Sequence, residues 1–182
     1  MLDVSKNSLT EVPDTISGLK ALITLDLSIN PLGKFKTDPL SPLFPLLLSV
    51  NNRLHAFFFV SISSFWLFFL FHAGKLPEGA TKLLSLETLN LSDTFLDFLP
   101  ANFGRLTKLR LLELRENQLA TLPKSMARLT ALKRLDLGQN DLCDLPDVIG
   151  SIPSLEELWI DGNKLDVLPD FLGQLPVRCV PT

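Results

Sequence analysis

The stretch LRLLELRENQLATLPKSMARLTA, residues 109–131, decides the fold because its skeleton recurs along the chain. The next copy, residues 132–154, reads LKRLDLGQNDLCDLPDVIGSIPS, and residues 155–177 read LEELWIDGNKLDVLPDFLGQLPV. An earlier copy, LETLNLSDTFLDFLPANFGRLTK, occupies residues 86–108. A fixed period of this size is the sequence signature of a protein built from stacked repeats, in which each unit contacts only its neighbours.

Four positions of the repeat keep their residue type through the six copies. The fourth position is Leu2, Leu25, Leu89, Leu112, Leu135 and Leu158; the sixth is Val4, Leu27, Leu91, Leu114, Leu137 and Ile160. The eleventh is Leu9, Leu32, Leu96, Leu119, Leu142 and Leu165; the fifteenth is Pro13, Pro77, Pro100, Pro123, Pro146 and Pro169. Stacked units bury a continuous leucine core, and each fully buried leucine contributes about 1.5–3 kcal/mol. The pattern L-x-x-L-x-L-x-x-N-x-L predicts an α/β leucine-rich repeat solenoid with a parallel, concave sheet.

Each repeat also carries local signals. Positions four to six alternate inward and outward, as a short strand does. An asparagine then turns the chain, and its buried amide must bond the open backbone groups of neighbouring turns. Thr94 takes this place in the third copy, with fewer hydrogen bonds to offer. The Leu-Pro pair prevents a regular helix there, so we expect a short helical or irregular convex side.

Composition narrows the function classes. The 182-residue chain suffices for one solenoid, and its net charge of -3 argues against a nucleic-acid partner. Two cysteines make no disulfide framework, which favours a reducing, intracellular compartment. His55 and His72 both lie outside the repeats, and neither a phosphate loop nor a metal-spaced Cys/His cluster is present. We therefore expect no enzyme, no cofactor and no metal.

Repeat two is interrupted. It runs normally to Gly33 and resumes at Lys75, and removing residues 34–74 restores the regular spacing of the repeats. This insert holds 9 of the 13 phenylalanines and only four charged residues. We therefore expect an extruded insert between two halves of one repeat.

Three interpretations of the insert compete. Residues 54–73 are long and apolar enough for a transmembrane helix, but a span would place the halves of repeat two on opposite sides of a bilayer. The second interpretation is a natural loop insertion, but a surface loop of this apolar composition would be prone to aggregation. The favoured interpretation is a translated intron, because Gly33-Lys34-Phe35 can be encoded GGT AAG TTT, with a splice donor, and Ala73-Gly74 can supply the acceptor. Splicing would then leave one glycine codon in frame.

The ends of the array depart from the repeat. In repeat one the first three positions are missing or replaced by Met1, and Arg178 stands where leucine is expected. We divide the chain into residues 2–33 (repeat one and part of two), 34–74 (insert), 75–177 (the rest, to repeat six) and 178–182 (divergent tail). Terminal repeats need caps, so we expect fraying ends and a fragment of a larger product that is marginally stable alone.

The outward side chains of the strands form the expected binding surface. Its candidate partner-binding residues are Glu113, Arg115, Arg134, Asp136, Trp159 and Asp161. The second position reads Glu87, Arg110, Lys133 and Glu156 in successive repeats, which suits either cross-strand charge pairing or a partner. The fifth position reads Asp3, Asp26, Asn90, Glu113, Asp136 and Trp159. Like charges at the spacing of neighbouring strands repel one another, and folding gives no reason for them, so we expect a partner to supply the opposite charge. Trp159, on the same face, is either a hot spot for binding or a residue that packs under a further repeat.

The successive repeats resemble those of one family in order. LELRENQL, RLDLGQNDL and LEELWIDGN, together with the lost asparagine in LNLSDTFLDFLP, are similar to the leucine-rich domain of the Scribble, Erbin and Densin group, the LAP family of leucine-rich repeat and PDZ scaffolds. The resemblance covers residues 2–175 apart from the insert. It implies a cytoplasmic scaffold at the basolateral membrane, cell junction or postsynaptic side that helps to set polarity and clusters receptors. The chain departs from the family in its insert, its missing caps and the absence of a PDZ domain.

The leading hypothesis is therefore a non-catalytic scaffold that binds protein partners on its concave face. Membrane association is then peripheral at most, unless residues 54–73 are a real span. That case gives a second hypothesis, a membrane-anchored leucine-rich repeat receptor. A third is a Ras-pathway regulator, because similar cytoplasmic repeats occur in Ras-associated proteins.

Overall fold

The computed structural model describes residues 1–32 and 74–175, so the interpretations of residues 34–73 and of the tail 178–182 lie outside this part of the chain. Within the described residues, the main sheet is parallel, with six strands in the order β1-β2-β4-β6-β7-β8. These strands are β1 (Leu2–Asp3), β2 (Thr24–Asp26), β4 (Thr88–Asn90), β6 (Leu111–Glu113), β7 (Arg134–Asp136) and β8 (Glu157–Trp159). A second parallel pair joins β3 (Gly74–Lys75) to β5 (Leu96–Phe98).

The register of the sheet follows the repeat. Leu112 pairs with Leu89 on one side and with Leu135 on the other, the equivalent leucines of the preceding and following repeats. Leu25 pairs with Leu89 in the same way, although the whole insert, residues 34–74, lies between them in the sequence. The ladder therefore continues across the interruption as one array, and the predicted fold class is confirmed.

The strands of the main sheet start one residue earlier than predicted, at position three, except β1, which starts at position four. The leucines on the core side of the sheet are almost fully buried. Leu25, Leu89, Leu112 and Leu135 at position four, and the leucines at position six that follow them, form the continuous core. Outward side chains at positions three and five remain partly exposed. The inward and outward alternation of the strands is thus confirmed.

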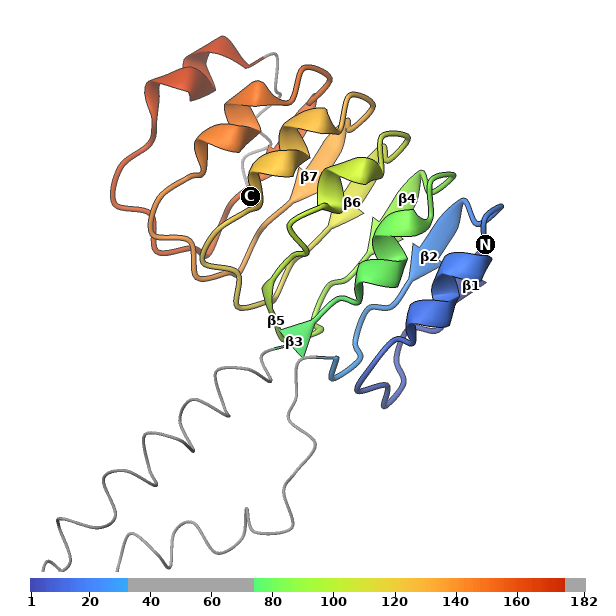
Figure 1. Ribbon diagram of the computed structural model, residues 1–182. Coiled ribbons are helices and arrows are strands. Elements are labelled where there is room, and N and C mark those ends of the chain that lie inside the picture. The colour runs from blue at the N-terminus through green and yellow to red at the C-terminus, as the bar shows by residue number, and fades with distance from the viewer. Residues whose placement is uncertain (33–73, 176–182) are drawn as a thin grey trace, which may run out of the picture.

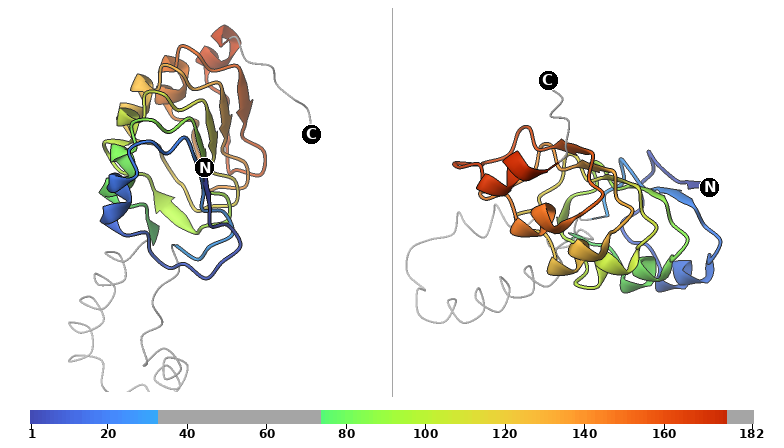
Figure 2. Two further views of the ribbon diagram at one scale, coloured as in Figure 1. Left: turned by 90° about the vertical axis from the view of Figure 1, so that its right-hand side faces the viewer. Right: turned by 90° about the horizontal axis from the view of Figure 1, so that it is seen from above.

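Short 3-10 helices cover the other side of the sheet. They are η1 (Asp14–Gly18), η3 (Glu78–Lys82), η4 (Phe103–Arg105), η5 (Lys124–Arg128), η6 (Asp147–Ser151) and η7 (Asp170–Gln174). All except η4 begin directly after the proline of position fifteen, whose fixed φ suits a helix start and whose missing N–H is not needed there. Figures 1 and 2 show these helices on the outer side of a curved array and the strands on its inner side.

The outer side is packed too tightly for a side chain at Gly104. A Cβ built on Gly104 would lie 1.8 Å from the backbone oxygen of Ser125 in the next repeat. The Ser125 hydroxyl accepts a hydrogen bond from the Gly104 N–H at 3.0 Å. Glycine therefore allows η4 and η5 to approach closely.

Asparagine side chains cross-link the turns, as predicted. The Asn140 amide group donates to the carbonyls of Leu137 in its own repeat and Leu114 in the preceding one, at 3.0 and 2.9 Å. Its carbonyl oxygen accepts from the Leu119 N–H at 3.0 Å. Asn30, Asn117 and Asn163 make the corresponding bonds in their repeats. Each asparagine thus satisfies backbone groups of two repeats at once.

Thr94 interrupts this ladder. Its buried hydroxyl lies 2.7 Å from the Leu91 carbonyl in its own repeat and 3.0 Å from the Asn117 side-chain oxygen. One hydroxyl proton serves only one of these acceptors at a time, and the side chain makes no bond to repeat two among the described residues. The adjacent Phe95 adopts a left-handed φ of 58°, which the other repeats do not show at this place.

Replacing Thr94 with asparagine should raise the free energy of unfolding by about 1 kcal/mol, since the longer amide can also reach the Leu27 carbonyl of repeat two. Thr94→Val, which keeps the shape and removes the hydroxyl, should lower it by about 1 kcal/mol. Urea denaturation of both variants checks this. A loss of stability in Thr94→Asn would show that this turn cannot accept the side chain used by its neighbours.

The sixth repeat is less well covered than the interior ones. Leu168 is 61% exposed, whereas Leu145 at the same position of repeat five is 4% exposed. Leu158 is likewise only partly buried. No further repeat packs on this side within the described residues. No helix in residues 1–32 and 74–175 is long and apolar enough to cross a membrane.

Candidate partner-binding face

The six residues predicted for partner binding gather on the inner side of β6, β7 and β8. Glu113 ends β6, Arg134 and Asp136 begin and end β7, and Trp159 ends β8. Arg115 and Asp161 follow shortly after β6 and β8. We call this surface, with its neighbours on β4, the concave face. The strand register brings Glu113 beside Asp136 and Asp136 beside Trp159.

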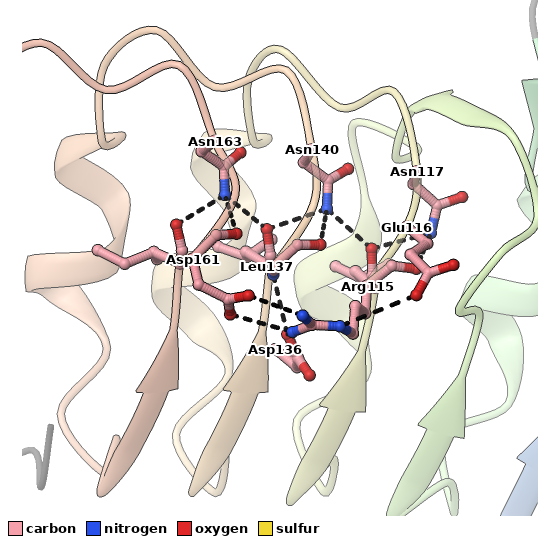
Figure 3. Close-up of polar contacts among 11 residues, drawn as sticks. Arg115, Glu116, Asn117, Asp136, Leu137, Asn140, Asp161 and Asn163 are labelled. Atoms are coloured by element: carbon pink, nitrogen blue, oxygen red, sulfur yellow. Dashed lines mark hydrogen bonds and ion pairs between the residues drawn. The ribbon is translucent and has the colours of Figure 1, made fainter. Parts of the chain in front are cut away.

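Arg115 and Asp161 form a two-pronged ion pair (Figure 3). Arg115 Nη1 donates to Asp161 Oδ1 at 3.0 Å, and Nη2 donates to Oδ2 at 2.7 Å. Asp136 Oδ1 lies 3.7 Å from the same guanidinium. The hydrogen bonds to Arg115 hold the pKa of Asp161 below its usual value, and those to Asp161 raise the pKa of Arg115. Both groups therefore stay charged and largely occupied by each other.

Trp159 and Arg134 form a second cluster at the end of the face. The Arg134 guanidinium carbon lies 4.9 Å from the centre of the Trp159 ring, within the range of a cation–π contact. Its Nε also lies 2.8 Å from Glu157 Oε2. Trp159 remains partly exposed. The contact thus presents a flat aromatic and guanidinium surface to the inner side of the array.

The expectation that folding has no use for the acids of the fifth position is wrong for Asp3, Asp26 and Asp136. Asp136 Oδ1 accepts the N–H of Gly138 at 2.8 Å, and Asp26 Oδ1 accepts the N–H and hydroxyl of Ser28. Asp3 does the same for Ser5. A short carboxylate that accepts a nearby N–H in this way stabilises the turn after the strand. This stabilisation offsets the repulsion between the acids that stack at the fifth position of successive repeats, which we call the fifth-position column.

Glu113 is the exception in this column. No hydrogen bond to its carboxylate is found within the described residues, and its longer side chain is not suited to the same cap. Partial burial and then the charge of Asp136 raise its pKa above the usual value. A raised carboxyl pKa means that the fold disfavours the ionised form. Turn capping therefore does not account for an acid at this position.

The second-position residues pair across strands, as one of the two interpretations expected. Lys133 Nζ lies 2.7 Å from Glu156 Oε1, and Arg110 Nε lies 3.5 Å from Glu87 Oε2. These exposed pairs contribute at most about 1 kcal/mol each.

Sequence reasoning missed Gly138, which occupies position seven between Arg115 and Asp161. A Cβ at Gly138 would lie 2.3 Å from Arg115 Nη1. The sequence did contain a signal for it. Position seven is an arginine in repeat four, a glycine in repeat five and an aspartate in repeat six, so two opposite charges stand on either side of the glycine.

The described residues contain no cluster of three or more His, Cys, Asp and Glu side chains that could hold a metal ion. The only cysteine they include, Cys143, is a free, exposed thiol. The chemistry on the concave face is therefore that of charges, amides and one tryptophan.

Comparisons with solved structures support the repeat fold. A leucine-rich repeat protein of Leptospira interrogans is 28% identical, with a TM-score of 0.58; the match covers 97% of this chain and 47% of that one. The plant peptide hormone receptor RGFR1, solved in complex with RGF2, is 24% identical, with a TM-score of 0.59 over 88% of this chain and 20% of the receptor. The chain thus spans about half of the first protein and a fifth of the second.

At the level of sequence families, residues 72–176 match the model described as a leucine-rich repeat region. No curated protein matches the chain. The family match covers more than half of the 182 residues, and it includes four of the strands of the main sheet and the whole candidate face. The chain therefore belongs to the leucine-rich repeat family.

Proposed function

We propose that this chain is a non-catalytic interaction module that holds a protein partner on its concave face. The observation that carries the proposal is the partly exposed Trp159 under Arg134, at the end of a column that contains the uncapped Glu113. Aromatic and arginine side chains are enriched among residues that dominate binding energy. Leucine-rich repeat arrays generally serve as protein-binding modules, and the family membership supports the same role here.

The chemistry of the face favours a partner with basic side chains. The cations of the face are already engaged: Arg110, Lys133 and Arg134 with glutamates, and Arg115 with Asp161. The carboxylates of Asp26, Glu113 and Asp136 keep solvent access and face the same side. A lysine or arginine from a partner would meet Asp26 and Glu113 without displacing an ion pair, whereas Asp136 already lies 3.7 Å from Arg115. These exposed carboxylates favour the approach of a cation electrostatically.

Within this function, the resemblance to the LAP group favours a cytoplasmic scaffold of cell polarity, junctions or synapses, at the basolateral membrane or postsynaptic side. The two other hypotheses, a membrane-anchored receptor and a Ras-pathway regulator, gain no support from a contact in the described residues. Dependence of binding on the nucleotide state of a Ras-type GTPase would favour the regulator.

Trp159→Ala and Glu113→Lys should each weaken binding of a partner peptide at least tenfold, because they remove the aromatic anchor and reverse the central charge. The test uses peptides selected from a random display library against the full chain, with dissociation constants measured by titration calorimetry. The selected sequences should be enriched in lysine and arginine.

Glu78→Lys provides the matched control, since Glu78 is exposed in η3 on the outer side and the charge change is the same. It should leave the dissociation constant unchanged. Equal affinity of all three variants and the parent chain, with folding verified by circular dichroism, would exclude the concave face as the binding site.

A further inference from the structure

The Arg115–Asp161 pair differs from the other ion pairs between repeats in the described residues because it skips a repeat. Arg115 belongs to repeat four and Asp161 to repeat six. The pairs of Arg110 with Glu87, Lys133 with Glu156, Arg134 with Glu157 and Lys164 with Asp141 all join adjacent repeats. Arg115 instead passes over repeat five, as Figure 3 shows.

The pair passes directly over a glycine of repeat five, Gly138, so a larger residue there would force the two side chains to shift. A Cβ on Gly138 would lie 2.3 Å from Arg115 Nη1 and 2.8 Å from Asp161 Oδ1, closer than ordinary van der Waals contact. The backbone does not require glycine there, because Gly138 is not among the described residues with a positive φ. Position seven of repeat five therefore stays open for the side chain of repeat four.

The geometry and partial burial of Arg115 and Asp161 favour a strong interaction between them. Their side chains are 33% and 27% exposed, so solvent screens the pair only in part. A guanidinium that grips both carboxylate oxygens forms a stronger and more directional contact than a single ion pair. Asp136 of repeat five lies 3.7 Å from the guanidinium and adds a further attraction to the crossing.

We propose that Arg115, Gly138 and Asp161 form a strap that ties the opening of repeat six to repeat four. In a simple repeat array each unit contacts only its neighbours, so a change in repeat four leaves the local opening of repeat six unchanged. With the strap, repeat six opens only when a contact to repeat four breaks. The inference goes beyond partner binding, because it concerns the free chain, and it links Arg115 to the strand that carries Trp159.

Amide hydrogen exchange of the full chain tests the strap. The reporters are the N–H groups of Glu157 and Lys164, which bond the carbonyls of Lys133 and Leu142 in repeat five. Arg115→Ala should speed exchange at both amides about fivefold, since the local opening loses one contact of moderate strength. Arg110→Ala, the same substitution in the same repeat, breaks only the pair with Glu87 and should change these rates less than twofold.

A second pair of variants separates the strap from a general loss of charge. Gly138→Ala keeps both charges but places a methyl group in the path of Arg115, so it should also speed exchange at Lys164. In the Arg115→Ala background the same Gly138→Ala change should have a clearly smaller effect, because only the contact of the methyl group with Asp161 remains. The strap is overturned if Arg115→Ala and Arg110→Ala act alike on repeat six, or if Gly138→Ala acts equally with and without Arg115.

Discussion

Asn117→Ala is expected to lower the free energy of unfolding by about 3 kcal/mol, because it removes several buried hydrogen bonds at once, including those accepted from the N–H groups of Leu96 and Thr94. The Asn117 amide donates to the carbonyls of Leu91 and Leu114 at 2.8 and 2.9 Å, and its oxygen accepts from the Leu96 N–H at 2.9 Å. Leu91 and Leu114 keep other donors, but the Leu96 N–H loses its partner. Urea denaturation measures the loss, and amide exchange should show the largest acceleration at Leu96.

Asn7→Ala is the matched control, since Asn7 holds the same position in repeat one but is exposed. Its amide bonds only the carbonyls of Val4 and Ser5 in its own turn. Water replaces such bonds readily, so the expected loss is below about 1 kcal/mol. If the two substitutions destabilised the chain equally, burial of the asparagine ladder would not be the source of its contribution.

Phe103→Ala should lower the free energy of unfolding by about 3–5 kcal/mol, the range for removing a buried aromatic side chain. Phe103 is fully buried in the core between the sheet and the 3-10 helices, and it starts η4. Tight packing of η4 against η5, where Gly104 meets Ser125, leaves the surrounding backbone little room to collapse into the cavity. Thermal and urea denaturation measure the effect.

Phe98→Ala makes the same chemical change in the same repeat at an exposed site. Phe98 ends β5 and is 37% exposed. Its substitution should change stability by less than about 1 kcal/mol. A loss as large as that of Phe103→Ala would show that burial does not set the cost of removing a phenylalanine in this repeat.

Much of the fold could be predicted because the repeat places equivalent residues in register. Leu89, Leu112 and Leu135 share position four, and once the units stack they must share one core. Asn117 and Asn140 follow by the same logic, since a buried amide at a fixed position meets the same carbonyls in every copy. The candidate face followed from alternation along the strands.

The role of the fifth position could have been predicted from local sequence and was not. Asp3, Asp26, Asn90 and Asp136 each have a serine or glycine two positions later, the spacing of a carboxylate or amide that caps a turn. Glu113 breaks that pattern, and the structure shows it as the acid without a cap. Turn capping thus explains the aspartates at this position but not Glu113.

The sequence by itself determined the repeat period, the leucine core, the asparagine ladder and which side chains face inward, because these depend on spacing alone. Only the tertiary structure decided which charges meet. Arg115 lies within ion-pair distance of Glu116 and Asp136, but the stacking of the strands and the space above Gly138 let it make its shortest contact, at 2.7 Å, with Asp161 two repeats away. A repeat pattern determines which side chains stack at the same position of successive repeats. Whether one of them reaches the equivalent residue two repeats away depends on the strand spacing, the curvature of the array and the size of the residue in the intervening repeat.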